Sequence, residues 1–168
     1  MSYMGTLIRV NLTSGKISYE DTPMDLARQY IGGRGLGSRM FINEVDPQVD
    51  PFSSENKLIF MTGPLSNTTA PTGGRYMVIT KSPLTGTIAS SNSGGVWGAY
   101  LKKAGYDGII FEGASPKPVF LSVSEQGVEL KDAGHVWGKR VEDTTNILGG
   151  ETGQKRVSVS CIGPAGEK

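Results

Sequence analysis

Two glycine pairs carry the residue types and the spacing that could bind an anion. The first pair is followed by an arginine in the run TGGR at 72–75. The second pair follows a polar dipeptide in the run NSGG at 92–95. A guanidinium presents a planar fork of donors that matches a phosphate group through two hydrogen bonds. Glycine amides at the start of a helix lie at its positive end and let a ligand approach closely. The pattern therefore predicts a phosphate-bearing ligand held by Arg75 and by a helix start at 92–95.

The elements around these pairs are expected to position them. Residues 76–80 (YMVIT) are β-branched and apolar enough for a strand, and a turn at 82–86 (SPLTG) leads into a second strand at 87–90. A helix follows, with its N-cap in the dipeptide 92–93 and the glycines 94–95 in its first turn. The apolar residues of this helix share one face, which is typical of a helix packed on a core.

A second interpretation stays open at this point. Both glycine pairs could be ordinary turns, with Arg75 a solvated surface residue, and spacing alone does not decide between the two. A further glycine-rich run at 32–37 (GGRGLG) does not fit a dinucleotide-binding loop, because position 38 is serine and because the run follows a helix where such a loop follows a strand. A turn between two helices is favoured there over a cofactor role for Arg34.

Composition excludes several classes of protein. With 17 basic and 16 acidic residues among 168, the chain does not have the charge pattern of a protein that binds nucleic acid or a membrane surface. No apolar run approaches the ~20 residues that a membrane span needs, and no signal peptide is recognisable, so a cytoplasmic location is expected. The single cysteine, Cys161, excludes an internal disulfide and a cysteine-ligated cluster within this chain.

The remaining pattern predicts an α+β fold, a single domain over 1–168 that is rich in antiparallel sheet. Short or alternating apolar runs predict strands, and capped amphipathic segments predict helices. The strands expected outside the central region are 6–12, 17–20, 57–62, 106–112, 119–123, 128–130 and 156–162. The other expected helices are one that Thr22 caps and two more at 36–44 and 139–148.

Isolated reactive side chains are assigned structural roles. His135 lies in a short loop with no partner at ligand spacing, so we interpret it as a packed loop histidine. Cys161 sits in the strand predicted last and is interpreted as a core residue. Asp107 and Glu112 flank a strand and are too isolated to form a catalytic carboxylate pair. No nucleophile with a base and an orienting group can be assembled from this sequence.

Several long motifs resemble one known family. The sequence is similar to the N-terminal domain of the aldehyde:ferredoxin oxidoreductases, which carry a tungsten (or molybdenum) bispyranopterin. The resemblance implies a β-rich base, built from two sheets, on which the flat cofactor lies. The motifs that carry it are 5–17 (GTLIRVNLTSGKI), 30–40 (YIGGRGLGSRM), the whole of 63–95, 104–115 (AGYDGIIFEGAS), 135–141 (HVWGKRV) and 160–167 (SCIGPAGE).

The resemblance also implies roles for single residues. The matching arginine of the family hydrogen-bonds a pterin phosphate, and that residue here is Arg75. The matching asparagine gives its backbone carbonyl to a magnesium ion that links the two pterin phosphates, and that residue here is Asn92. Ser93, Gly94 and Gly95 complete the expected cofactor-binding set. Enzymes of this family oxidise aldehydes with water to carboxylic acids and pass electrons to ferredoxin through an iron–sulfur cluster, whereas some relatives reduce carboxylic acids or aromatic thioesters.

The family's cluster cysteines, further pterin-binding motifs and acid–base residues belong to later domains. We therefore expect this chain to be inactive alone, as a domain fragment or as one piece of a split enzyme. Its partners would be the remaining domains or a partner subunit, with ferredoxin for the complete enzyme. The alternative is a non-catalytic folded module or docking subunit with no cofactor of its own. A partner-seeking apolar surface favours the first hypothesis, and a monomer without one favours the second.

Overall fold

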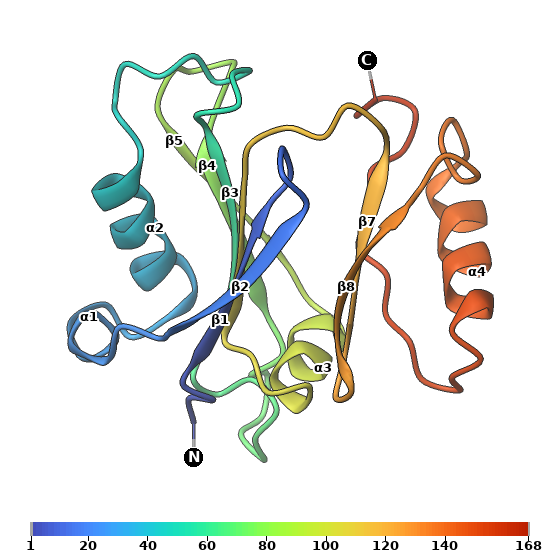
Figure 1. The fold of residues 1–168 in the computed structure, drawn as a ribbon. Helices are drawn as coiled ribbons and strands as arrows, with labels where there is room; N and C mark the ends of the chain where they lie inside the picture. Colours follow the sequence, from blue (N-terminus) through green and yellow to red (C-terminus); the bar gives the residue numbers. More distant parts are fainter. Residues whose placement is uncertain (1, 168) are drawn as a thin grey trace.

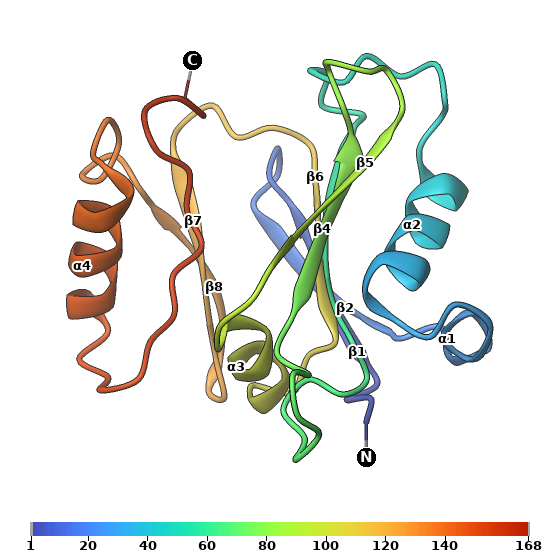
Figure 2. The same ribbon diagram turned by 180° about the vertical axis from the view of Figure 1, so that it is seen from behind.

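The computed structural model describes residues 2–167 and shows two sheets with four helices in that range (Figures 1 and 2). This confirms the α+β class. The strands are β1 (Thr6–Asn11), β2 (Lys16–Asp21), β3 (Lys57–Thr62), β4 (Tyr76–Lys81), β5 (Ile88–Ser93), β6 (Gly108–Glu112), β7 (Val119–Ser124) and β8 (Gly127–Asp132). The helices are α1 (Met24–Tyr30), α2 (Gly33–Glu44), α3 (Trp97–Lys103) and α4 (Val141–Glu151).

The larger sheet has six strands in the order β2-β1-β6-β3-β4-β5. All its neighbouring pairs are antiparallel except β1 and β6, which run parallel with Ile8 opposite Ile109. The hairpin β7–β8 forms a separate two-stranded sheet. The prediction of a fold rich in antiparallel sheet is thus correct, and the long crossover from β1 to β6 supplies its one parallel pair.

One face of the larger sheet is covered by α2 (Figure 2). Leu36, Met40 and Phe41 of this helix pack against buried apolar residues of the strands beneath. The helix can approach closely because Gly37 has no side chain: a Cβ there would lie 2.5 Å from Cδ1 of Ile79. The glycine run at 32–37 is therefore partly a packing motif that seats α2 on the sheet.

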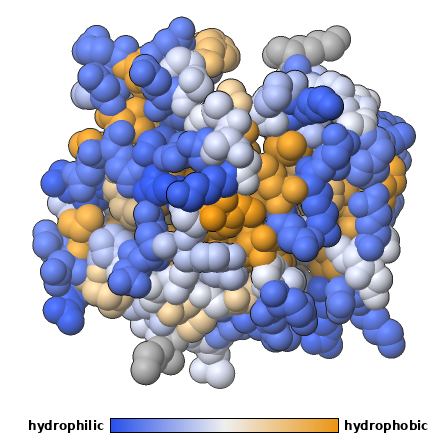
Figure 3. Space-filling view, in the orientation of Figure 1, coloured by the Kyte–Doolittle hydropathy of each residue, from blue (hydrophilic) through white to orange (hydrophobic). Residues whose placement is uncertain are grey.

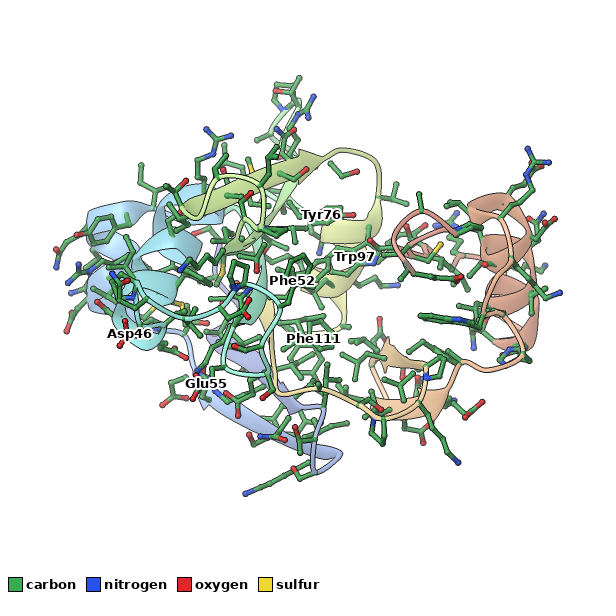
Figure 4. All side chains as sticks on the ribbon, turned by 90° about the horizontal axis from the view of Figure 1, so that it is seen from above. Asp46, Phe52, Glu55, Tyr76, Trp97 and Phe111 are labelled. Carbon is green, nitrogen blue, oxygen red and sulfur yellow. The ribbon has the colours of Figure 1, made fainter. Side chains whose placement is uncertain are left out.

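The opposite face is covered by α3 and by the β7–β8 hairpin, and α4 packs on the outer side of that hairpin (Figure 1). Apolar side chains gather between the larger sheet and the hairpin (Figure 3). The rings of Tyr76 and Trp97 pack there with centroids 4.4 Å apart and planes tilted by 37°, and Phe111 projects into the same layer (Figure 4). Trp97 is thus partly buried against the core, whereas Trp137 is 49% exposed.

The strand predicted at 156–162 is wrong, because this segment forms no strand. Its sequence alternates, but an alternating segment becomes a strand only where another strand offers a free edge, and the segment reaches the protein body through side chains. Val159 packs near α4, and the Ser160 hydroxyl lies 3.2 Å from that of Tyr76. Cys161 is consequently only partly buried and lies outside any strand.

Two further predictions need correction. The Thr22 hydroxyl does not cap α1, because it donates to the buried carboxylate of Asp107 at 2.8 Å. His135 does have an acidic partner: its Nε2 lies 2.7 Å from Oε1 of Glu151, a residue brought near by α4, and the imidazole is not packed but 43% exposed. No helix within 2–167 is long and apolar enough to span a membrane.

Candidate anion-binding site

Arg75 lies directly before β4, at the end of the sheet where β4 pairs with the edge strand β5. The register places Met77 opposite Asn92 and Tyr76 opposite Ser93. This pairing brings Arg75 beside the chain that leaves β5. The Arg75 guanidinium donates through Nη1 to Oδ1 of Asn92. The two residues singled out in the sequence therefore meet in the structure, through their side chains.

The predicted helix start at 92–95 is wrong. Strand β5 continues through Ser93, and α3 begins only at Trp97 with Val96 as its N-cap. Asn92 and Ser93 extend the ladder with β4, which satisfies their backbone groups better than a helix cap would. The glycines 94–95 form a link between strand and helix, with Gly95 at φ 81°. The amides that open α3 therefore give no support to an anion site.

The two glycine pairs nevertheless lie against each other. A Cβ on Gly74 would lie 2.9 Å from the carbonyl oxygen of Gly95, so only glycine allows this approach at position 74. Gly94 differs, because a Cβ there would have no atom of the described chain within 4 Å. Its lack of a side chain is not required by packing or by a positive φ. The space beside Gly94 is open.

A cavity of about 300 Å³ lies next to Arg75. Among the described residues 2–167, the only charged ones that line it are Arg34 and Arg75, so two guanidiniums share one cavity that none of the described acidic side chains lines. The other lining residues are small or apolar: Ile31, Gly32, Gly33, Gly63, Pro64, Leu65, Thr72, Gly73 and Met77. An uncompensated pair of positive charges in partly apolar surroundings suits an anionic ligand.

Sequence reasoning missed the part that Arg34 plays in this cavity. It placed Arg34 in a turn between helices, whereas α2 begins at Gly33 and carries Arg34 in its first turn. The close approach of Gly32 to the loop after β3 explains the placement, since a Cβ on Gly32 would lie 3.0 Å from Cδ of Pro64. The available signal was an arginine flanked by glycines directly after a helix.

A second charged cluster lies at the other end of α2, and it is fully paired. Arg9 of β1 donates to Glu20, Glu44 and Glu112 at 2.9–3.0 Å, and Lys57 bridges Glu44 and Glu112 at 2.6 and 3.3 Å. Burial alone would raise the pKa of Glu44, but hydrogen bonds from Arg9 and Lys57 hold that pKa below its usual value. The same network lowers the pKa of Glu112. This cluster joins strands to helix, and each of its two cations already has acidic partners.

The buried pair Lys102–Asp107 is also structural. The two side chains lie 2.7 Å apart and are almost wholly buried. Burial would raise the pKa of Asp107, but hydrogen bonds from Lys102, from the amides of Met4 and Gly5, and from Thr22 lower it. Asp107 thus anchors the N-terminal segment and is not part of a catalytic carboxylate pair. Between residues 2 and 167, no cluster of three or more His, Cys, Asp or Glu side chains could hold a metal ion.

Comparisons with known proteins agree on one family. Residues 7–168 match the family profile of the aldehyde ferredoxin oxidoreductase N-terminal domain. The chain is 56% identical over 165 residues to a tungsten-containing aldehyde ferredoxin oxidoreductase of Pyrococcus abyssi, and 51% identical over 163 residues to one of Pyrococcus furiosus. These matches cover 98% and 97% of this chain but only 27% of each relative.

More distant relatives share the same region. The chain is 36% identical over 140 residues to the WOR-like subunit of an aliphatic sulfonate oxidoreductase of Pyrococcus furiosus, covering 82% of this chain and 22% of that protein. Among solved structures, the active-site complex of a benzoyl coenzyme A reductase with 1,5-dienoyl-CoA superposes with a TM-score of 0.96 at 41% identity. That match covers 99% of this chain and 25% of the solved chain.

Proposed function

Because this chain belongs to the aldehyde ferredoxin oxidoreductase family, we propose that it is the cofactor-cradling N-terminal part of a tungsten (or molybdenum) bispyranopterin oxidoreductase. The complete enzyme oxidises aldehydes to carboxylic acids and passes the electrons to ferredoxin through an iron–sulfur cluster that other domains or a partner subunit hold. The chain spans about a quarter of the relatives' length, 27% for the two Pyrococcus enzymes, and we propose that the rest of the enzyme carries the cluster and the acid–base groups. The enzyme works in the cytoplasm.

The residues around Arg75 fit the phosphate end of such a cofactor. Arg75 would hold the phosphate through a fork of hydrogen bonds. The guanidinium is oriented by the hydrogen bond that it donates to Oδ1 of Asn92. The open space beside Gly94 leaves room for a flat ligand against the backbone. Ser93 and Gly95 do not line the cavity, and their proposed role is to contact the same ligand beyond its edge. The backbone carbonyl of Asn92 is the proposed ligand of a magnesium ion.

When bound, the cofactor supplies the two-electron redox chemistry, and this chain positions it. The observation that carries the proposal is a cavity with two guanidiniums and no acid among its lining residues, next to the contact between Arg75 and Asn92. Both arginines are exposed, so water stabilises them in the empty protein, but neither has an acidic partner within the part of the chain that the structure describes. This arrangement favours a binding site over the interpretation of both glycine pairs as simple turns.

The exposed apolar residues at the rim of this cavity argue against the alternative of a free-standing module. Ile31 and Leu65 line the cavity and are both more than half exposed. Phe52 and Leu84 elsewhere are almost fully exposed. Apolar side chains that surround a charged cavity favour a surface that another part of an enzyme covers. We propose that the remaining domains or partner subunit cover this rim.

Metal and pterin analysis of the assembled enzyme tests the proposal. The chain is produced together with the remainder of the enzyme, and tungsten, molybdenum and pterin are measured per polypeptide. Arg75→Gln should lower pterin retention about tenfold, because a lost charge-assisted hydrogen bond to phosphate is worth roughly 1.5–3 kcal/mol. The control is Arg28→Gln, which removes an exposed arginine of α1 that pairs only with Asp25. A wild-type assembly that contains neither metal and no pterin would refute the proposal.

A further inference from the structure

We infer that Arg34 is a second phosphate-binding residue, which holds the cofactor's phosphate ester together with Arg75. This inference rests on the proposed function. It adds Arg34 to the binding residues and specifies the negatively charged group that they hold. The juxtaposition that carries it is the shared cavity: Arg34 enters from the first turn of α2 and Arg75 from the residue before β4. The two guanidiniums come from segments about forty residues apart, so their meeting is not a consequence of sequence neighbourhood.

Neither guanidinium has its charge compensated within the part of the chain that the structure describes. Arg34 makes no hydrogen bond or ion pair with residues 2–167, and the one hydrogen bond of the Arg75 side chain goes to the neutral amide of Asn92. Two like charges in one cavity repel, and a bound anion replaces that repulsion by attraction to both. The apolar lining residues Ile31, Pro64 and Met77 weaken solvent screening of this attraction.

Arg34 also lies where a helix disfavours a positive charge. The N-terminus of α2 has no side-chain cap and no acidic residue in its first turn, so its free amides and Arg34 add their positive potential. Helices α1 and α4 have Asp25 and Glu142, respectively, at the corresponding place. Arg34 departs from the preference for acidic residues in the first turn of a helix, and it does so beside a cavity. Such departures are expected at sites that bind a ligand.

The number of donors selects the class of anion. Each guanidinium offers two parallel donors to one oxygen pair, and a carboxylate has only one such pair. A phosphate monoester carries up to two negative charges and three terminal oxygens, which can serve both forks at once. The cavity therefore fits a phosphate ester better than a carboxylate. Within the proposed enzyme, the resident cofactor supplies that group.

Substitutions in this chain, produced together with the rest of the enzyme, test this inference. Arg34→Gln removes the charge at similar length, Arg34→Lys keeps the charge without the fork, and Arg28→Gln is the matched control outside the cavity. Each variant is washed with rising sodium chloride, and the retained pterin per polypeptide is measured. We expect Arg34→Gln to lower retention about tenfold at moderate salt, Arg34→Lys to recover part of it, and the control to match wild type.

Chemical footprinting provides a readout independent of substitution. Phenylglyoxal modifies accessible guanidiniums, and mass spectrometry measures its rate at Arg34 and Arg28 in enzyme with cofactor and in enzyme from a host that cannot make the pterin. Arg34 should react about tenfold more slowly in the loaded enzyme, as expected for a group engaged in charge-assisted hydrogen bonds, while Arg28 reacts equally in both. Equal rates at Arg34 would overturn the inference, even if Arg34→Gln failed to fold.

The outcomes separate this inference from the proposed function. If Arg75→Gln loses pterin while Arg34→Gln retains it as well as Arg28→Gln does, Arg34 is not a phosphate ligand and the proposed function still stands. If wild-type enzyme carries no tungsten, molybdenum or pterin, both are refuted. Loss of pterin from both arginine variants, with protection of Arg34 in the loaded enzyme, supports both.

Discussion

The two ends of helix α2 carry charge in opposite ways. At the C-terminal end, Glu44 adds a negative charge to the negative end of the helix dipole, and Arg9 and Lys57 from the sheet compensate it. At the N-terminal end, Arg34 adds a positive charge to the positive end, and Arg75 from the sheet adds another. At the C-terminal end, the chain itself supplies the counter-charges. At the N-terminal end, none of the described residues that line the cavity is acidic.

This difference separates charges that complete a fold from charges that complete a site. The Arg9 side chain is only 19% exposed, and all its three nitrogens donate to carboxylates. Burying such a group is tolerable only with its partners present. Arg34 and Arg75 are exposed and lack acidic partners, so the fold tolerates them through solvation. Substitutions at the two ends should therefore differ in size and even in sign.

The largest effect is expected for Arg9→Leu. The substitution removes the cation that pairs with Glu20 and leaves Glu44 and Glu112 with Lys57 alone. Uncompensated carboxylates in partly buried positions should cost about 3 kcal/mol of stability. Hydrogen exchange of α2 and β1 amides in the full-length enzyme measures this loss locally. Arg28→Leu, at a side chain that is 78% exposed, should leave the same amides unchanged. Equal exchange in both variants would contradict a structural role for the network.

The next effect comes from the middle of the helix, which connects the two ends. In Gly37→Ala, the new Cβ would lie 2.5 Å from Cδ1 of Ile79 and 3.3 Å from Cβ of Met61, so the buried Ile79 side chain or the helix must shift. Overpacking of this kind should cost about 2 kcal/mol. Amide exchange of α2 should accelerate, and pterin retention should fall because the shift moves Arg34. Unchanged exchange in Gly37→Ala would show that this contact does not seat the helix.

A smaller effect distinguishes the two ends by pH. Burial raises the pKa of Glu44, but the hydrogen bonds and charges of Arg9 and Lys57 lower it further. The pKa in the folded protein therefore lies below that in the unfolded chain. Stability from this carboxylate is therefore complete above the unfolded pKa of about 4.3 and is lost as the pH falls through the folded pKa. In acid-unfolding curves, Glu44→Gln should start less stable at neutral pH and decline less steeply below pH 4.3. A parallel decline would refute the linkage.

The sequence predicted most strands and helices because their signals are local. The run at 57–62 and the turn at 82–86 define strands and a hairpin without reference to distant residues. The start of α3 was misplaced because the end of β5 depends on its ladder with β4, and the strand at 156–162 was expected from alternation without a partner strand. Tertiary pairing decides such boundaries.

The candidate site was predicted in part for the same reason. Arg75 and Asn92 flank one predicted hairpin, so their proximity follows from local pairing, although Asn92 was predicted in a helix start and lies in the strand β5 instead. The place of Arg34 beside Arg75 depends on how Gly32 packs against Pro64, after β3. That contact joins segments about thirty residues apart and has no local signature. Residues of one hairpin are thus predictable as a site, and a residue contributed by a packed helix is not.

The smallest effect has the opposite sign from the others and tests the comparison most directly. In enzyme without cofactor, Arg34→Gln removes a positive charge from the positive end of α2 and relieves its repulsion with Arg75, so the helix should become more stable by about 0.5 kcal/mol. Slower exchange of the first α2 amides in that variant measures the gain, with Arg28→Gln as the control. In enzyme with cofactor the same substitution should remove a ligand contact and bring no gain. A charge that destabilises the cofactor-free protein is expected to be retained because it binds a ligand. A loss of stability in the cofactor-free variant would instead make Arg34 a structural residue like Arg9.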